Sequence, residues 1–272
     1  MEIAERWRAP LTWRVLQGAS RLVIPIFCRF RVTGVVSAAH AAGPAILAAN
    51  HISNFDPFCM TLGSRRRGIA PRMMATGGLF RPPVIGRVMT AAGHIPVDRG
   101  RETVAQAVPT AVTALRAGSV VGIYPEGRIG LDPQMWPERA KTGLARLALQ
   151  TGAPVIPVAI WGSHEVIAYH GRGPMIRTLV SSIWRRPTVR MHFGAPVDLS
   201  DLREGTIGHA QRATDRIMTA LTMEVAKLRV DEPGLPRFVD PTRPISTARS
   251  YRTRQPTVRM IDHRYIDGAD GP

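Results

Sequence analysis

The sequence predicts an α/β protein in which helices cover both faces of a sheet. Over residues 40–200, apolar runs of strand length alternate with segments of helical length and pattern, an order typical of this class. Apolar residues make up 44% of the 272-residue chain, so a sizeable core is expected. We predict one α/β domain over 37–230, preceded by an N-terminal helical element (1–36) and followed by an extended or disordered tail (231–272).

The first 36 residues predict amphipathic helices that associate with a membrane. Trp7 and Trp13 stand in an apolar segment punctuated by arginines, a composition typical of helices that lie in the membrane interface. The alternative is a helix pair packed on the domain, with its arginines in water. Neither a secretory signal nor a spanning helix is expected, because Glu2 and Glu5 lie near the start and no apolar run reaches about 18 residues.

An apolar run at 44–49 predicts a short buried strand, and a histidine and an aspartate follow it. His51 and Asp56 are five positions apart, a spacing that would splay their side chains in a straight helix. Asp56 before Pro57 is a typical helix start, with Ser53 as a competing cap, so the chain must turn between the two residues. We interpret His51 as a general base and Asp56 as the acid that orients it. The alternative is a polar loop in which Asp56 only caps a helix.

The remaining elements follow from apolar pattern and from glycine and proline stops. In order, they are a helix to 65–67, a strand at 71–74, a helix at 83–93, a strand from 95, a helix at 102–117, a strand at 119–124, a helix at 141–152, a strand at 155–160, a strand and turn at 188–198, and a helix at 207–230. Pro109 lies inside one of these helices and argues against a single straight helix there.

Arginine and glutamate side chains follow two of these strands. Arg99 follows the strand that begins at 95, and its planar guanidinium matches phosphate oxygens, so it is a candidate phosphate clamp. The alternative is a salt bridge to Asp98 or another acid. The strand at 119–124 delivers Glu126 to the sheet edge where we expect His51.

The sequence offers no sign of a serine nucleophile or a metal. Ser163 and His164 are adjacent, but no Gly-x-Ser-x-Gly elbow occurs, so we do not interpret Ser163 as a nucleophile. The histidines show no ligand spacing with acids, so no metal is expected. Cys28 and Cys59 have apolar neighbours and are expected to be reduced core residues.

Four blocks in this order resemble the glycerolipid acyltransferase family, which includes the 1-acylglycerol-3-phosphate acyltransferases. They are His51 to Asp56, residues 93–99, residues 124–128 and residues 155–160. The resemblance covers about 30–200. In the third block the family's usual Glu-Gly-Thr-Arg is replaced by Glu-Gly-Arg-Ile, and the missing threonine leaves the role of Arg128 open.

The resemblance implies a glycerol-3-phosphate acyltransferase-like fold, a mixed sheet flanked by helices. It also implies transfer of a fatty acyl group from acyl-CoA or acyl carrier protein to a lysophospholipid hydroxyl, with 1-acyl-sn-glycerol-3-phosphate as the first candidate. His51 and Asp56 would be catalytic, with backbone N–H groups near Gly127 stabilising the oxyanion and no cofactor required. The substrate-binding residues implied are Arg99, Glu126, Gly127 and Arg128. Because a carboxylate repels phosphate, we expect Glu126 to orient an arginine or a substrate hydroxyl.

The chain is strongly basic, with a net charge of +16. Seven arginines and six acids lie after residue 230, so nearly all of this charge belongs to residues 1–230. Such a surface suits an anionic partner. Aromatic residues are only 6% and no nucleic-acid module is recognisable, so we expect an anionic membrane and a peripheral or monotopic location on its cytoplasmic face. The alternatives are an acyltransferase for a glycolipid or amino-lipid, a non-enzymatic basic membrane-binding protein, and a hydrolase.

Overall fold

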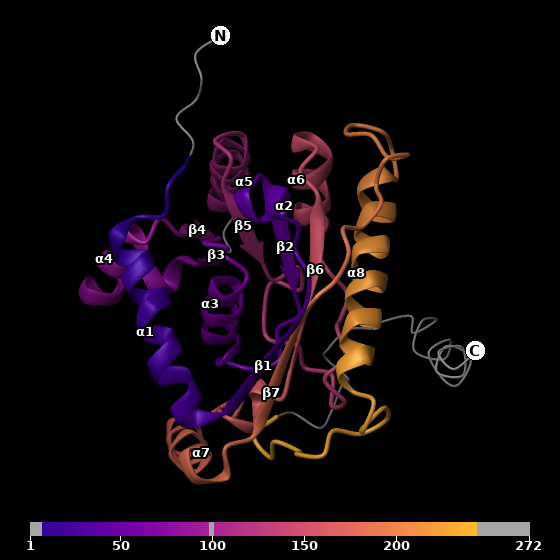
Figure 1. Ribbon diagram of the computed structural model, residues 1–272. Helices are drawn as coiled ribbons and strands as arrows, with labels where there is room; N and C mark the ends of the chain where they lie inside the picture. Colours follow the sequence, from indigo (N-terminus) through magenta and orange to yellow (C-terminus); the bar gives the residue numbers. More distant parts are fainter. Residues whose placement is uncertain (1–6, 98–100, 244–272) are drawn as a thin grey trace.

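A twisted sheet runs through the molecule, with helices on both of its faces (Figure 1). The computed structural model describes residues 7–97 and 101–243. For residues 101–106, at the start of one helix, it describes the backbone only. The described sheet has seven strands in the order β1-β7-β6-β2-β5-β3-β4. Their bounds are β1 Arg29–Gly34, β2 Ala45–Ala49, β3 Arg72–Thr76, β4 Ile95–Val97, β5 Val120–Ile123, β6 Val155–Trp161 and β7 Thr188–Phe193.

The sheet is mixed, as predicted. Strand β2 is parallel to both β5 and β6, β3 is parallel to β5 and β4, and β1 is parallel to β7. The single antiparallel pair in this sheet joins β6 to β7. Because parallel strands end at a common edge, the residues that follow β2, β4 and β5 all leave the sheet on the same side.

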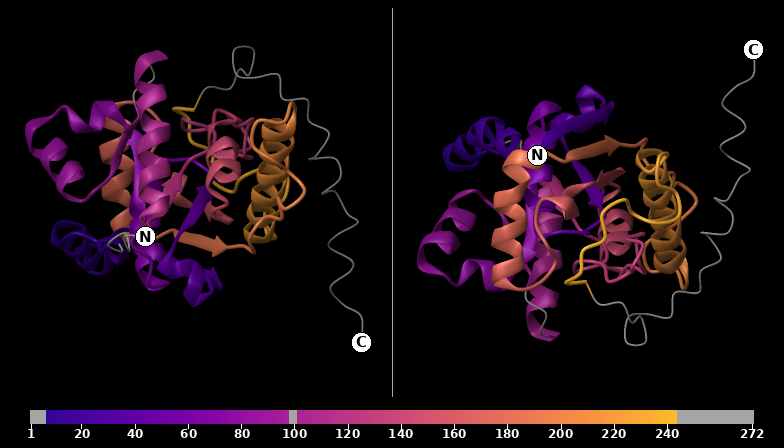
Figure 2. Two further views of the ribbon diagram at one scale, coloured as in Figure 1. Left: turned by 90° about the horizontal axis from the view of Figure 1, so that it is seen from above. Right: turned by 90° about the horizontal axis from the view of Figure 1, so that it is seen from below.

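Two hydrophobic cores, one on each face, explain why β2 is buried along its whole length. Ala45, Leu47 and Ala49 face one core, and the alternate residues Ile46 and Ala48 face the other, as the two-residue period of a strand requires. Helices α1, α3 and α7 cover the first face, and α5, α6 and α8 cover the second. Figure 2 shows these layers from above and below.

The helices largely match the expected segments. Their bounds are α1 Leu11–Phe27, α2 Ala38–Ala42, α3 Asp56–Arg66, α4 Pro83–Ala91, α5 Arg101–Arg116, α6 Gly143–Thr151, α7 Arg172–Arg185 and α8 His209–Leu228, with short 3-10 turns η1 at Gly77–Phe80 and η2 at Ser163–Glu165. Pro109 lies inside α5 without ending it. Helices α2 and α7 were not predicted.

The N-terminal region differs from the predicted all-helical element. One helix, α1, is followed at Arg29 by β1, which pairs with β7 and forms an edge of the sheet. Exposed Arg29 and Arg31 alternate with buried Phe30 in this strand, a two-residue period that the sequence interpretation attributed to a helix. The sheet therefore begins before residue 37.

The C-terminal region also differs from the expected loose tail. Residues 231–243 form neither helix nor strand, yet they pack on the domain. Glu232, Asp240 and Arg243 are all buried there. Residues 244–272 lie outside the described residues, so the prediction for them stays open.

Candidate active site

The candidate base and its orienting acid meet in the turn between β2 and α3. Nδ1 of His51 lies 2.8 Å from Oδ2 of Asp56. The same oxygen accepts hydrogen bonds from the backbone N–H groups of Ile52 at 2.7 Å and Ser53 at 2.8 Å. The carboxylate thus faces back into the turn. The helix cap is Phe55, whose side chain makes no capping bond, rather than Asp56 or Ser53.

The second oxygen of the Asp56 carboxylate is held by a residue 107 positions away. Ser163 Oγ donates to Asp56 Oδ1 at 2.5 Å, and both side chains are fully buried. Sequence reasoning rejected Ser163 as a nucleophile and found no other role for it. No sequence signal pointed to this contact, because it depends on where β6 and η2 end relative to α3.

The His51 ring is oriented by two neighbours. Its Nδ1–H donates to Asp56, which selects the tautomer whose Nε2 accepts protons. The Tyr124 ring stacks on the imidazole, with ring centroids 4.2 Å apart and planes inclined by 20°. At the end of β2, the Asn50 side chain bonds both the N–H and the C=O of Ile160, at 2.7 and 2.9 Å. This strand end is therefore tied to β6 immediately before His51.

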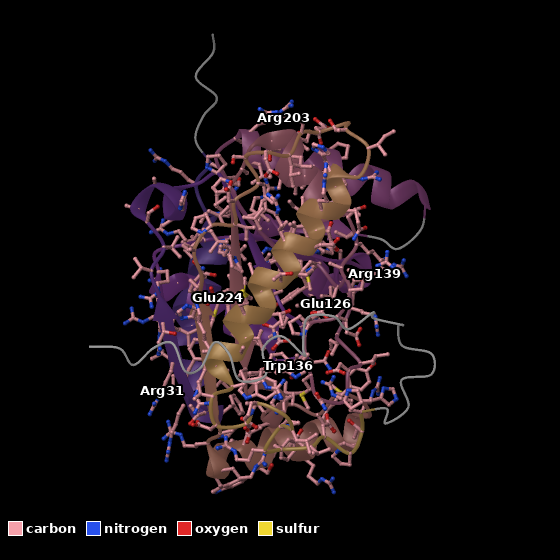
Figure 3. All side chains as sticks on the ribbon, turned by 90° about the vertical axis from the view of Figure 1, so that its right-hand side faces the viewer. Arg31, Glu126, Trp136, Arg139, Arg203 and Glu224 are labelled. Carbon is pink, nitrogen blue, oxygen red and sulfur yellow. The ribbon has the colours of Figure 1, made fainter. Side chains whose placement is uncertain are left out.

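Glu126 lies beside His51 but contacts its main chain. Oε1 accepts a hydrogen bond from the His51 N–H at 3.2 Å, and Oε2 accepts one from the Glu138 N–H at 3.1 Å. Burial raises the pKa of Glu126 to about 8, although the two backbone donors act in the opposite direction. In Figure 3, Glu126 and Trp136 are labelled beside the C-terminal half of α8.

The two residues after Glu126 have other partners. The Gly127 N–H donates to the Tyr124 carbonyl at 2.9 Å and closes a turn, and its φ of 70° favours glycine. In this conformation the Gly127 N–H is not positioned as an oxyanion donor. Arg128 forms an ion pair with Glu138, whose other oxygen accepts from the Leu131 N–H at 2.8 Å. Glu138, which the sequence analysis did not single out, therefore organises this loop.

Arg99 lies outside the described residues. Strand β4, which ends two residues before it, is linked through β3 to β5 by parallel pairing. The chain therefore leaves β4 at the same sheet edge as it leaves β2 before His51. Among the described residues, no group of three or more His, Cys, Asp or Glu side chains is placed to hold a metal ion.

Comparisons with known proteins agree with this architecture. The sequence profile of the family described as Acyltransferase matches residues 29–161, which contain His51, Asp56 and the loop with Glu126. These residues therefore form an acyltransferase domain. The four sequence blocks that resemble glycerolipid acyltransferases all lie within this region, so the prediction of an acyltransferase is confirmed for residues 29–161.

Several curated relatives are named 1-acyl-sn-glycerol-3-phosphate acyltransferase. A chloroplastic 1-acyl-sn-glycerol-3-phosphate acyltransferase of Brassica napus is 24% identical over 64% of this chain and 48% of its own length. Enzymes of that name from Limnanthes douglasii and Borreliella burgdorferi are 30% and 29% identical, over 46% and 44% of this chain and 43% and 46% of their own lengths. The chain thus spans about half the length of the curated relatives it matches.

A solved structure confirms the fold. The 1-acyl-sn-glycerophosphate acyltransferase PlsC of Thermotoga maritima superposes with a TM-score of 0.57 at 18% identity. The match covers 80% of this chain and 79% of that one. It therefore includes elements beyond the 29–161 region.

Proposed function

We propose that this protein is an O-acyltransferase that moves a fatty acyl group from acyl-CoA or acyl carrier protein to the hydroxyl of 1-acyl-sn-glycerol-3-phosphate, giving phosphatidic acid. The observation that carries the proposal is the 2.8 Å contact between His51 Nδ1 and Asp56 Oδ2 at the edge of the sheet. The names of the relatives support the choice of acceptor.

In the proposed reaction, His51 Nε2 removes the proton from the acceptor hydroxyl as its oxygen attacks the thioester carbonyl. Asp56 stabilises the imidazolium that forms. When the tetrahedral intermediate collapses, the C–S bond breaks and the imidazolium protonates the thiolate. The acceptor hydroxyl takes the place of a serine nucleophile, so no covalent acyl-enzyme is needed.

The proposal assigns substrate binding to the loops after β4 and β5. Arg99 would hold the acceptor phosphate through its guanidinium. Glu126 would keep the His51 loop and the loop after β5 together, a role supported by its two backbone hydrogen bonds. Arg128, which forms an ion pair with Glu138, would bind substrate at the rim of the site. We keep a glycolipid or amino-lipid acceptor as the alternative, because the third block lacks the family's threonine.

The proposed location is the anionic cytoplasmic face of a membrane, with α1 as the contact. Trp13, Gln17, Ser20 and Ile24 are buried on one side of this helix, whereas its opposite side exposes Leu11, Val15, Leu22 and Ile26. Exposed Arg14 and Arg21 flank this apolar side, as expected for a helix on anionic lipid. Within the described residues, no helix has both the length and the apolar composition to span a membrane.

The test is acceptor-dependent thiol release from oleoyl-CoA, comparing wild type with His51→Ala. Loss of a general base predicts a fall in kcat of about 10²-fold or more. Undiminished activity of the variant would remove His51 as the base. If wild type releases thiol only with a glycolipid or amino-lipid acceptor, the chemistry stands and the proposed acceptor is wrong.

A further inference from the structure

The C-terminal segment 229–243 lies beyond the matched acyltransferase region but is anchored next to the active site. At its start, the Arg229 guanidinium lies between two indole rings, 4.0 Å from the centroid of Trp136 and 4.1 Å from that of Trp161. Further along, Glu232 accepts a hydrogen bond from Trp161 Nε1 at 2.7 Å. The segment is therefore attached both to the loop after β5 and to the end of β6.

Its far end is attached to the chain between η2 and α7. The Asp240 carboxylate accepts a hydrogen bond from the backbone N–H of Tyr169. Thr242 Oγ1 accepts one from the N–H of His170 at 2.9 Å. These bonds fix the backbone immediately before Arg243, whose guanidinium also lies over the Tyr169 ring.

Arg243 bridges the two loops that enclose the candidate base. Its Nη1 donates to the carbonyl of Gly130 and its Nη2 donates to the carbonyl of Ile52, both at 2.5 Å. Gly130 in turn donates its N–H to the His51 carbonyl at 2.7 Å, and Ile52 donates its N–H to Asp56 Oδ2. Both residues held by Arg243 are thus bonded directly to the His51–Asp56 pair.

A buried guanidinium is a costly way to fill space. Taking the charge out of water is unfavourable, and an apolar side chain of similar size would fill the same volume at lower cost. What the guanidinium provides is a planar fork whose donors have a fixed spacing. Two carbonyls bound to one fork are held at a set separation.

We propose that Arg243 is a positioning residue for the His51–Asp56 pair, holding the His51 loop and the loop through Gly130 in register, so that catalysis depends on the C-terminal segment. This inference rests on the proposed function for its kinetic consequences. Its structural part, the coupling of the two loops, is independent of the substrate.

The kinetic test uses Arg243→Met in the full chain, with Arg237→Met as the matched control. Arg237 lies on the same segment but pairs with Glu165 at 3.2 Å and is 61% exposed. For Arg243→Met we expect kcat per folded enzyme to fall about 10²-fold with little change in either KM, because misplaced catalytic groups impair turnover rather than substrate binding. Arg237→Met should retain wild-type kcat. Equal kcat values for the two variants would overturn the proposal.

Hydrogen exchange tests the same inference without any substrate. In Arg243→Met, amide exchange should accelerate by about tenfold or more in residues 50–56 and 127–131, and remain at the wild-type rate in Arg237→Met. Unchanged exchange in both loops would overturn the coupling. If wild type transfers no acyl group, the proposed function fails, whereas this measurement still decides the role of Arg243.

If Arg243→Met does not fold, Arg243→Lys is the second variant for the same two measurements. It keeps the charge but replaces the planar fork by a single flexible ammonium. We expect faster exchange in both loops and a kcat reduced about tenfold. Wild-type exchange together with wild-type kcat in this variant would show that the fork has no positioning role.

Discussion

Oε1 of Glu126 accepts a hydrogen bond from the backbone N–H of His51, with 3.2 Å between the two atoms. The other oxygen of the carboxyl group binds the N–H of Glu138 at 3.1 Å. The glutamate therefore joins the turn that carries the proposed base to the loop after β5. The side chain is buried, and this burial raises its pKa from an ordinary value of 4.5 to about 8.

This shift predicts a pH dependence of stability that Glu126→Gln should remove. Between pH 4.5 and about 8 the carboxyl is ionised in the unfolded chain and protonated in the folded one. The contribution of this carboxyl group to the free energy of unfolding is thus fully present below pH 4.5, falls as pH rises toward 8, and changes no further above that. Urea denaturation of both proteins across this range should show wild type losing up to about 1.4 kcal/mol per pH unit more than the variant. If the free energy of unfolding changed with pH equally in wild type and Glu126→Gln, the raised pKa of Glu126 would be contradicted.

Asp56→Asn should impair catalysis far more than Ser163→Ala. The amide would present the wrong group to His51 Nδ1, so we expect kcat to fall by about 10²- to 10⁴-fold. Ser163→Ala removes one hydrogen bond from Oδ1 and leaves the His51 contact intact, so we expect a loss of about tenfold or less. Thiol release, with circular dichroism to check folding, measures both. Equal losses would mean that the His51–Oδ2 contact is not the decisive one.

The stacked ring of Tyr124 can be tested separately from its hydroxyl. Among the described side chains, the Tyr124 hydroxyl is buried without a hydrogen-bond partner, so Tyr124→Phe should keep wild-type kcat and gain about 1 kcal/mol of stability. Tyr124→Leu removes the ring that lies on His51, and we expect kcat to fall about tenfold because the imidazole is less constrained. A loss of activity in the phenylalanine variant would assign a role to the hydroxyl instead.

Arg99→Ala tests the proposed phosphate clamp. Loss of a charge-assisted contact to the acceptor should raise the acceptor KM by about tenfold or more while leaving the donor KM unchanged. Arg116→Ala removes the same charge from the exposed C-terminal end of α5 and serves as the control. Equal changes in both KM values for Arg99→Ala would exclude a specific role in binding phosphate.

The outward side of α1 can be tested by co-sedimentation with anionic vesicles. Leu22→Glu places a charge in the centre of the exposed apolar side and should weaken vesicle binding by about tenfold. Ile207→Glu makes the same kind of change at another exposed apolar residue, in the loop before α8, and should bind like wild type. Deletion of residues 1–36 is unsuitable, because it would also remove β1 from the sheet. Wild-type binding by Leu22→Glu would place the membrane contact elsewhere.

Local sequence determined the features that depend on short stretches of chain. The apolar run before His51 forms β2, and Asp56 meets His51 because the chain turns and restarts as a helix at Asp56 and Pro57. The four ordered blocks were enough to predict the acyltransferase family and the mixed sheet. At the N-terminus, apolar composition alone was misleading, because the alternating pattern of β1 was attributed to a helix.

Tertiary structure decided which distant groups surround His51. Ser163 reaches Asp56, and Glu126 reaches the His51 N–H, because β2 lies between β5 and β6 and the loops that leave them share one edge. Arg243 arrives from beyond α8, where no periodic pattern marks its destination. These contacts join residues 75 to 191 positions apart. Such pairings depend on strand order and on the paths of irregular segments, which hydrophobic periodicity does not encode.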